Sequence, residues 1–363
     1  MQLPDMIPNR LTNQHLIGPP ATSVADLVAW QGAVQSQDVP GALWALGQRL
    51  SGVSLADLQA AFDRGDILRT HVLRPTWHYV TPADLRWLQL ATSHRVQRLI
   101  AYQKRQHDLT DHHLDRYSQL IVDALQGHNA LTRSDLFTRF AAAGMPADGV
   151  RGAHVLMHAE LECLIASGPL KGRQHTYMLL AERAPLTTNV SHDEALALLA
   201  TRYVQSHGPA TVRDLAWWSS LTLAEAKRAI MLAGSNLTSV DIDGTPWFVG
   251  TDAPPPSSFE SPLVRLLPNY DEYVARDGKV DRGDGPPAEL ATALHTAGRF
   301  DRHHIVVDGC LYGGWRRTLD TKQVTIELDP FVTFSPEVRA ATAREAERHA
   351  SFLNLSLNLV WLD

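Results

Sequence analysis

Two patterns of apolar residues alternate along the first two thirds of the chain. Where apolar residues recur every three or four positions, the spacing predicts helices with one buried face. These segments are residues 37–50, 55–64, 114–126, 147–164, 193–206 and 222–232. Where β-branched and aromatic residues cluster instead, we expect short strands, and this occurs at residues 67–80, 165–180 and 237–250.

A short signature repeats among these segments. The pair Thr132 and Asp135 recurs 79 positions later as Thr211 and Asp214. Thr is a favoured helix N-cap, and Asp three residues later places negative charge in the first helical turn. A weaker copy of the pattern lies at residues 23–27. Three helices followed by a hairpin is the plan of a winged helix, so the repeats predict three tandem winged-helix units.

The character of the chain changes after a run of prolines and serines at residues 254–258. Beyond it, strands are predicted at 263–267, 305–307, 311–315 and 324–328, followed by a helix at 336–352. The expected fold class is therefore α+β, predominantly helical, with three winged-helix units and a β-rich C-terminal part. The expected boundaries are 1–110, 111–185 and 186–252 for the three units and 253–363 for the C-terminal region.

Composition narrows the class of protein. The 363 residues are 44% hydrophobic and 20% charged, which is typical of a globular chain. No apolar run approaches the ~20 residues of a membrane-spanning helix, and two cysteines are too few for a disulfide framework. We therefore expect a cytoplasmic protein. The net charge of −6 argues against a nucleic-acid partner at first sight.

The charge is unevenly distributed, however. Between residues 67 and 107 of the sequence, Asp84 is the only acidic residue. The same stretch contains seven basic residues: Arg69, Arg74, Arg86, Arg95, Arg98, Lys104 and Arg105. Because salt screens exposed charges beyond about 10 Å, a local basic field can attract a polyanion on an acidic protein. A solvated helix face is the alternative explanation for such a cluster.

Two polar stretches are candidates for chemistry. In the first, Gln35 and Gln37 flank Ser36 and precede Asp38, at an expected boundary between two helices. Two such amides could both point outward and orient a water molecule, although an amide cannot deprotonate it. The alternative is a polar turn that caps a helix. The second stretch, residues 69–78, would bring polar groups to one face of a strand, or form a basic strand without further role.

A metal site has weaker support. His154 and His158 lie four residues apart on a predicted helix, with Glu162 four further on, but the sequence supplies no evident fourth ligand. Ordinary, partly buried helix residues explain this spacing better. We therefore expect no metal and no cofactor.

Both polar stretches, together with residues 214–218, 267–273 and 308–317, resemble the AlkZ/YcaQ family of bacterial winged-helix DNA glycosylases. The resemblance covers almost the whole chain. The family signature is Gln-x-Gln in the AlkZ branch and Gln-x-Asp in the YcaQ branch, so Gln35 and Gln37 point to the AlkZ branch. The middle residue is usually aliphatic in the family, whereas this chain has Ser36.

The resemblance implies a fold, a reaction and roles for particular residues. Members form a C-shaped scaffold and excise bulky N7-alkylated purines, and some unhook interstrand crosslinks. The implied protein is a monomeric, monofunctional glycosylase that acts on duplex DNA without a metal or cofactor. Gln35 and Gln37 would hold the attacking water against C1′, with electrostatic support from Asp38 and His78. The implied DNA contacts are Arg69, Arg74, Thr76, Arg95 and Arg98.

Two other functions remain open from the residues. A non-catalytic DNA-binding protein, such as a transcriptional regulator, could use the same winged helices. Its recognition helices would need several basic residues, whereas the second and third predicted ones carry only Arg151 in one and Lys227 with Arg228 in the other. A metal-dependent hydrolase would rest on His154 and His158 alone.

Overall fold

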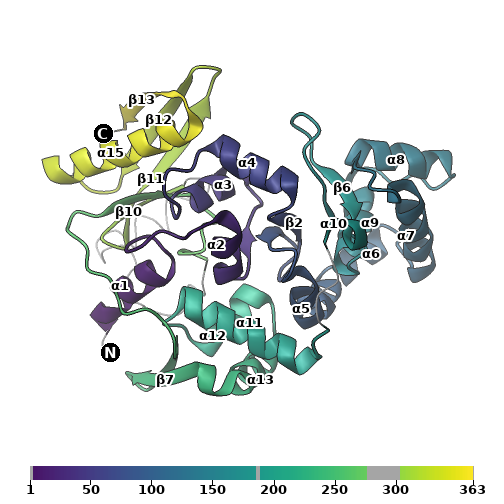
Figure 1. Cartoon of the computed structure of the whole chain (residues 1–363), viewed down its shortest axis with the longest axis horizontal. Helices are drawn as coiled ribbons and strands as arrows, with labels where there is room; N and C mark the ends of the chain where they lie inside the picture. Colours follow the sequence, from purple (N-terminus) through teal and green to yellow (C-terminus); the bar gives the residue numbers. More distant parts are fainter. Residues whose placement is uncertain (1–2, 185–188, 276–302, 363) are drawn as a thin grey trace.

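The computed structural model describes residues 3–184, 189–275 and 303–362. The chain forms three helical units and a C-terminal sheet, and the second unit, the third unit and the sheet are arranged around the first unit (Figure 1). We name the units by their described residues: the first helical unit spans 24–80, the second 111–179 and the third 192–250. Among the described residues, no helix combines the length and apolar character needed to cross a bilayer.

The first helical unit combines three helices with a small antiparallel sheet of order β1-β3-β2. Helix α1 (Leu3–Asn13) precedes it, and α5 (Leu85–Leu99) and α6 (Ala101–Gln106) follow it. Its elements are α2 (Val24–Gln31), β1 (Val34–Gln35), α3 (Val39–Gly47), α4 (Leu55–Arg64), β2 (Leu68–His71) and β3 (Trp77–Val80).

The second helical unit has the same order of elements and an equivalent sheet of order β4-β6-β5. Helix α10 (Leu180–Arg183) follows it directly. Its elements are α7 (Asp111–Leu125), β4 (Leu131–Thr132), α8 (Arg133–Ala142), α9 (Gly149–Leu161), β5 (Ile165–Ser167) and β6 (Thr176–Leu179).

The third helical unit repeats the order once more, with its first strand reduced to a single bridge between Ala210 and Phe248. A short 3₁₀ helix, η1 (Gly234–Asn236), leads into its hairpin. Its elements are α11 (His192–His207), α12 (Val212–Ser219), α13 (Leu223–Ala233), β7 (Leu237–Ile242) and β8 (Thr245–Gly250). In every unit the residue or strand before the second helix therefore pairs with the last strand.

The predicted helix caps are confirmed. Thr132 and Asp135 form a reciprocal capping box at the start of α8, and Thr211 and Asp214 form another at the start of α12. In the first unit, Ser23 also caps a helix, by accepting a hydrogen bond from the main-chain N–H three residues later. That helix is α2, the first of its unit, whereas Thr132 and Thr211 cap the second, so the predicted alignment of this copy with the other two is wrong. These local bonds satisfy N–H groups that a helix leaves unpaired at its first turn.

The C-terminal part is one five-stranded sheet of order β13-β12-β11-β10-β9. The predicted strands and final helix are confirmed. The apolar run at the end of the chain is a further strand, β13, that the sequence did not predict, and it pairs with β12 in parallel. The elements are β9 (Val264–Leu267), β10 (His303–Val307), β11 (Cys310–Leu319), β12 (Gln323–Pro330), α15 (Pro336–Leu353) and β13 (Ser356–Trp361).

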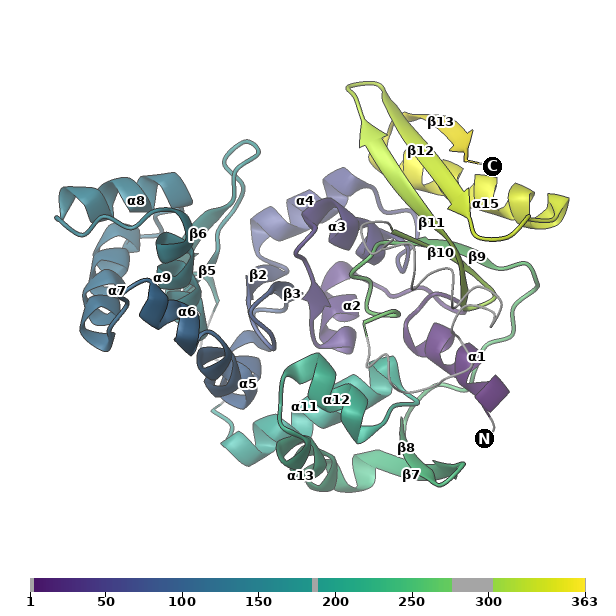
Figure 2. The same ribbon diagram turned by 180° about the vertical axis from the view of Figure 1, so that it is seen from behind.

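The first helical unit shares its core with two neighbours. On one side Trp44 of α3 packs with Phe352 of α15 and donates its indole N–H to the carbonyl of Leu266, 2.7 Å away. On the other side α5 and the β2–β3 hairpin share a core with α11, and Trp218 is fully buried there. Figure 2 shows α2 and α3 between the C-terminal sheet and the third unit. The first helical unit therefore brings together segments that are distant in sequence.

Candidate active site

Gln35 lies between the helices α2 and α3, as the sequence suggested, but in a two-residue strand, β1, that was not predicted. In the antiparallel pairing of β1 with β3, Gln35 is opposite His78. The main-chain N–H of Ser36 donates to the carbonyl of Trp77 at 2.8 Å, which extends the pairing by one residue. The Gln-x-Gln segment is therefore held along one strand before the chain turns into α3.

The amide of Gln35 is buried and fixed by an arginine. Its side chain is 9% exposed, and its Oε1 accepts a hydrogen bond from Arg74 at 2.8 Å. The same guanidinium donates to the carbonyl of Trp218 at 2.7 Å and lies over the ring of Trp217, 5.2 Å from its centre. Burial lowers the pKa of Arg74. The side chain expected to contact phosphate is therefore committed to orienting Gln35.

His78 completes this side of the site as a neutral group. Burial and the charge of Arg74 lower the pKa of His78 to about 3. Its Nδ1 lies 3.0 Å from the carbonyl of Thr76, and its Nε2 lies 3.2 Å from Arg74. The neutral ring satisfies both contacts if Nδ1 carries the proton and Nε2 accepts from the guanidinium.

A buried carboxylate accepts a hydrogen bond from the main chain of β1. Glu272 is 2% exposed, and its Oε1 accepts from the main-chain N–H of Gln35 at 2.7 Å. Its Oε2 accepts from the indole of Trp218 at 2.8 Å and lies 3.1 Å from His207 Nε2. Burial favours the neutral acid, but His207 and Arg74 outweigh it and lower the pKa of Glu272 to about 2. Glu272 is therefore an anion that joins three parts of the chain.

The segment that carries Glu272 is itself anchored by a buried ion pair. Arg49 donates to both carboxylate oxygens of Asp271, at 2.8 and 2.7 Å, and both side chains are almost fully buried. Two parallel hydrogen bonds fix the planes of both groups. Sequence reasoning had noted this segment only as part of the family resemblance and had assigned no role to Glu272 or Asp271.

Gln37 and Asp38 face a different environment from Gln35. Gln37 is exposed, and its Oε1 lies 3.4 Å from the main-chain nitrogen of Trp77. The expectation that both amides point outward is therefore right for Gln37 and wrong for Gln35. Asp38 is the N-cap of α3 but makes no side-chain capping bond, and its carboxylate lies 3.4 Å from Arg317 of β11.

The other predicted DNA contacts are divided between two places. Arg69 lies beside the motif: its guanidinium donates to the carbonyl of Ser36 at 3.2 and 3.3 Å and stacks 4.4 Å over the ring of Trp77. Thr76 is nearby, and its buried hydroxyl has no partner among the described residues.

Arg95 and Arg98 are not part of this group. Both lie on α5, where Arg95 donates to the carbonyl of Ser220 at 3.1 Å and lies 3.6 Å from Glu225. Arg98 is exposed near the end of that helix. Arg95 is therefore held against the third helical unit, and neither residue has a hydrogen bond or ion pair to the Gln-x-Gln segment among the described residues.

The two histidines considered for a metal site lie on α9, in the second helical unit and not in the Gln-x-Gln segment. His154 is next to His107, with ring centres 5.9 Å apart, and His158 Nδ1 lies 3.3 Å from both Gln97 and Lys104. Burial and the neighbouring cation Lys104 lower the pKa of both histidines. Within the described ranges, no three His, Cys, Asp or Glu side chains gather as a metal site would require.

Comparison with solved structures identifies the type of fold. The structure is similar to the Streptomyces sahachiroi DNA glycosylase AlkZ, with a TM-score of 0.78 over 98% of each chain and 22% sequence identity. The mixed, mostly helical architecture with a C-terminal sheet is therefore an AlkZ-like fold.

Sequence comparison adds the family. The model of the family described as DNA glycosylase AlkZ-like matches residues 28–352, most of the chain. The protein therefore belongs to the AlkZ-like DNA glycosylase family, and a DNA substrate follows from that membership. No curated protein matches the sequence.

Proposed function

We propose that this protein is a monofunctional DNA glycosylase that hydrolyses the N-glycosidic bond of N7-alkylated purines in duplex DNA. The observation that carries the proposal is the Gln-x-Gln segment, in which Gln35 is held by Arg74 from the side and by Glu272 from below. Purines in interstrand crosslinks are a second substrate class to be tested. No metal or cofactor is needed for this chemistry.

The charges around the segment suit the reaction. Alkylation at N7 makes the purine a good leaving group, and positive charge then develops on the deoxyribose. Gln35 and Gln37 would place a water molecule against C1′, because a correctly positioned reactant removes much of the entropic barrier. The anions Glu272 and Asp38 would stabilise the developing positive charge through fixed positions in the protein. Asp38 is the nearer to solvent, since Glu272 is covered by the strand.

We further propose that the three helical units are winged helices that serve as domains for DNA binding. Their shared order of helix, short strand, two helices and hairpin supports this assignment. The proposed boundaries remain 1–110, 111–185, 186–252 and 253–363. Arg69 and Arg98, which are partly or fully exposed, are the candidates for phosphate contacts, whereas Arg74 is proposed to position Gln35.

A non-catalytic DNA-binding protein is the alternative, because the same three units could bind DNA without chemistry. The buried polar site favours the enzyme. Burial of two charged groups, Arg74 beside the Gln35 amide and Glu272 beneath the same strand, costs free energy. Binding of duplex DNA alone does not require either buried charge.

The experiment uses duplex DNA that contains a single N7-methylguanine, followed by heating in alkali to cut abasic sites. We expect strand breaks with the wild-type protein and almost none with Gln35→Ala or Gln37→Ala. Gln119→Ala is the matched control, because it removes an exposed amide on α7 and should leave the breaks unchanged. Binding without breaks by the folded wild-type protein, on both N7-methylguanine and crosslinked duplexes, would favour the alternative.

A further inference from the structure

A cleft of about 560 Å³ lies where the second helical unit meets the first. We call it the aromatic cleft and define it by the lining residues that matter here: Arg69, Trp77, Arg133, Phe137, His175 and Tyr177. The β2–β3 hairpin forms one wall, and α8 with β6 forms the other. Figure 1 shows the β5–β6 hairpin beside α4 and β2, and the main-chain N–H of Leu170 donates to Asp63 there at 2.7 Å.

Flat side chains are held in place on both walls. Arg69 stacks 4.4 Å over Trp77, and Arg133 lies 5.1 Å over Phe137. The Phe137 ring lies directly against Gly152 of α9, where a Cβ atom would be only 2.2 Å from the ring. The cleft therefore presents rings and guanidinium planes whose positions are already fixed before anything binds.

The cleft is also positively charged. The hydrogen bonds that the structure gives to Arg69 and Arg133 go to the main-chain carbonyls of Ser36 and Gly149, so that neither guanidinium forms a direct ion pair among the described residues. Burial and the charge of Arg69 lower the pKa of His175 to about 4, so that this ring is neutral near pH 7. An occupant should therefore combine a planar ring with negative charge.

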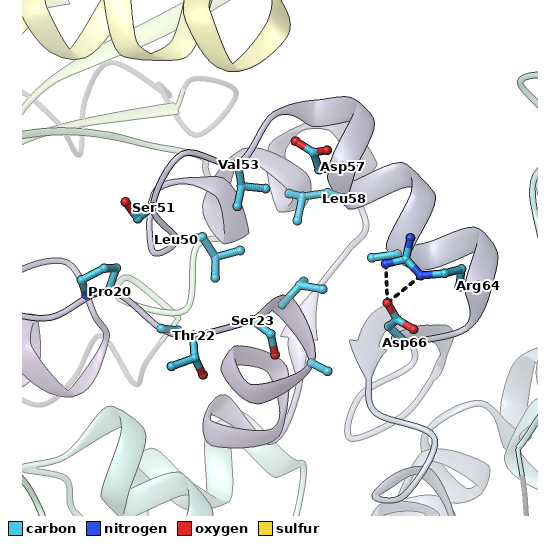
Figure 3. Close-up of a pocket in the computed structure, with 14 residues that line it drawn as sticks. Pro20, Thr22, Ser23, Leu50, Ser51, Val53, Asp57, Leu58, Arg64 and Asp66 are labelled. Carbon is cyan, nitrogen blue, oxygen red and sulfur yellow. Dashed lines mark hydrogen bonds and ion pairs between the residues drawn. The ribbon is translucent and has the colours of Figure 1, made fainter.

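A second pocket on the first helical unit provides a contrast (Figure 3). It is similar in size, at about 520 Å³, and lies between the start of α2 and α4. None of its lining residues is aromatic, and its cation, Arg64, is already paired with Asp66 at 2.6 Å. Asp57 adds further negative charge. Size alone therefore does not distinguish the two hollows, whereas ring content and charge do.

We propose that the aromatic cleft binds one unpaired nucleotide of the DNA substrate, with a neutral base and its anionic phosphate. Aromatic rings and guanidinium planes stack on bases of any sequence, and the arginine charges attract the phosphate. An N7-alkylated purine is a cation and would be repelled by Arg69 and Arg133, so the occupant is a neutral base that has lost its pairing, such as the partner of the lesion.

The position of the cleft connects it to the proposed reaction. Arg69 bonds to the carbonyl of Ser36, and the main chain of Trp77 faces the amide of Gln37. The wall formed by the β2–β3 hairpin therefore touches the Gln-x-Gln segment. This inference rests on the proposed function for its choice of DNA as ligand, but the binding itself can be measured on undamaged DNA.

The test compares two undamaged duplexes, one fully paired and one with a single bulged 2-aminopurine, whose fluorescence falls when the base stacks. We expect the wild-type protein to bind the bulged duplex at least about fivefold more tightly and to quench it, since stacking stabilises such contacts. Phe137→Leu keeps an apolar side chain in the core but removes the ring, and it should abolish both the preference and the quenching.

Arg133→Ala tests the phosphate contact separately. It should weaken binding of the bulged duplex and lower the slope of log affinity against log salt by about one, because one phosphate contact is lost. Arg139→Ala, an exposed arginine on the same helix outside the cleft, is the matched control and should change neither quantity.

Three outcomes would overturn the inference: equal affinity of the wild-type protein for the two duplexes, preference retained in Phe137→Leu, or the same loss in Arg139→Ala as in Arg133→Ala. Failure of base release from N7-methylguanine, with the bulge preference intact, would overturn the proposed reaction and leave the cleft assignment standing. The two proposals can therefore fail independently.

Discussion

The first and second helical units place the same short strand before the second of their three helices, but they use that junction differently. In the second unit Thr132 ends β4 and forms a capping box with Asp135, so that α8 begins on a local, self-contained set of bonds. In the first unit β1 is followed by an exposed turn, and the N-cap Asp38 makes no capping bond to α3. Its carboxylate pairs with Arg317 from the C-terminal sheet instead.

The partners of the two junctions differ in the same way. The bonds at Thr132 come from within four residues, whereas Gln35 is held by Arg74 and by Glu272, which is 237 residues away in sequence. The first junction therefore lacks the local capping bonds of the second and instead forms a polar site with residues from distant segments. A repeated unit can therefore supply the scaffold at each copy while one copy carries the chemistry.

Removal of the long-range partner should have the largest effect on stability. Glu272→Ala leaves the buried donors of Gln35, His207 and Trp218 without their acceptor. We expect the free energy of unfolding to fall by about 3–5 kcal/mol, as for other broken buried charge networks. Urea unfolding measures this loss. Glu347→Ala, an exposed residue on α15, should stay close to wild type, and an equally small loss in Glu272→Ala would show that the carboxylate does not hold the junction.

The second-largest effect should come from acid, which should lower the free energy of unfolding through His78 at the first junction. His78 has a pKa of about 3 in the folded protein, so between pH 6.5 and 3 the unfolded chain binds a proton at this position that the folded protein does not. The free energy of unfolding therefore falls as the pH falls, by about 1.4 kcal/mol per pH unit for this histidine.

The control for this pH dependence comes from the second unit. Urea unfolding between pH 6.5 and 4.5 should give a shallower dependence in His78→Asn than in the wild type. His112→Asn alters an exposed histidine in the first turn of α7 and is the matched control with which the slope of His78→Asn is compared. An unchanged slope in His78→Asn would mean that His78 is not held neutral at the site.

The capping difference should give the smallest change in stability. Thr132→Ala removes a capping box and should cost about 1 kcal/mol, with little effect on base release. Asp38→Asn removes no capping bond and keeps an oxygen within reach of Arg317, so its cost should be smaller than that, while base release slows. Thermal unfolding and the release assay, run on both variants, measure the two effects. The reverse order of stability would contradict the contrast drawn between the junctions.

The sequence predicted what local chemistry determines. The Thr132 and Thr211 caps, the strands within residues 237–250 and the final helix follow from residues within a few positions of one another. Strands β1 and β13 were missed because their pairing partners are distant and each short run could belong to several structures. The order of helices and hairpin within each unit could be predicted because each unit is contiguous in sequence.

The candidate site was only half predictable for the same reason. The two amides form a recognisable motif, and Arg74 lies in a basic stretch. Charge alone suggested a phosphate contact for Arg74, because nothing nearby in sequence indicates that its guanidinium is buried against Gln35 and Trp218. Glu272 lies in a segment that contributes to the family resemblance. The acidic pair Asp271–Glu272 lies between Tyr270 and Tyr273, shortly after the apolar run 263–267, and this is the signal that could have suggested a buried role.

We propose that base release takes place at the β1–α3 junction of the first helical unit and not at the equivalent β4–α8 junction of the second. The most direct measurement is the single-turnover rate of N7-methylguanine release by the wild type, Gln35→Ala and Thr132→Ala, together with the unfolding free energy of each. We predict that Gln35→Ala lowers the rate by about 10²-fold or more, as for other lost positioning groups, and remains folded. Thr132→Ala should lose stability and keep the rate. A folded Gln35→Ala protein that releases the base at the wild-type rate would contradict the account.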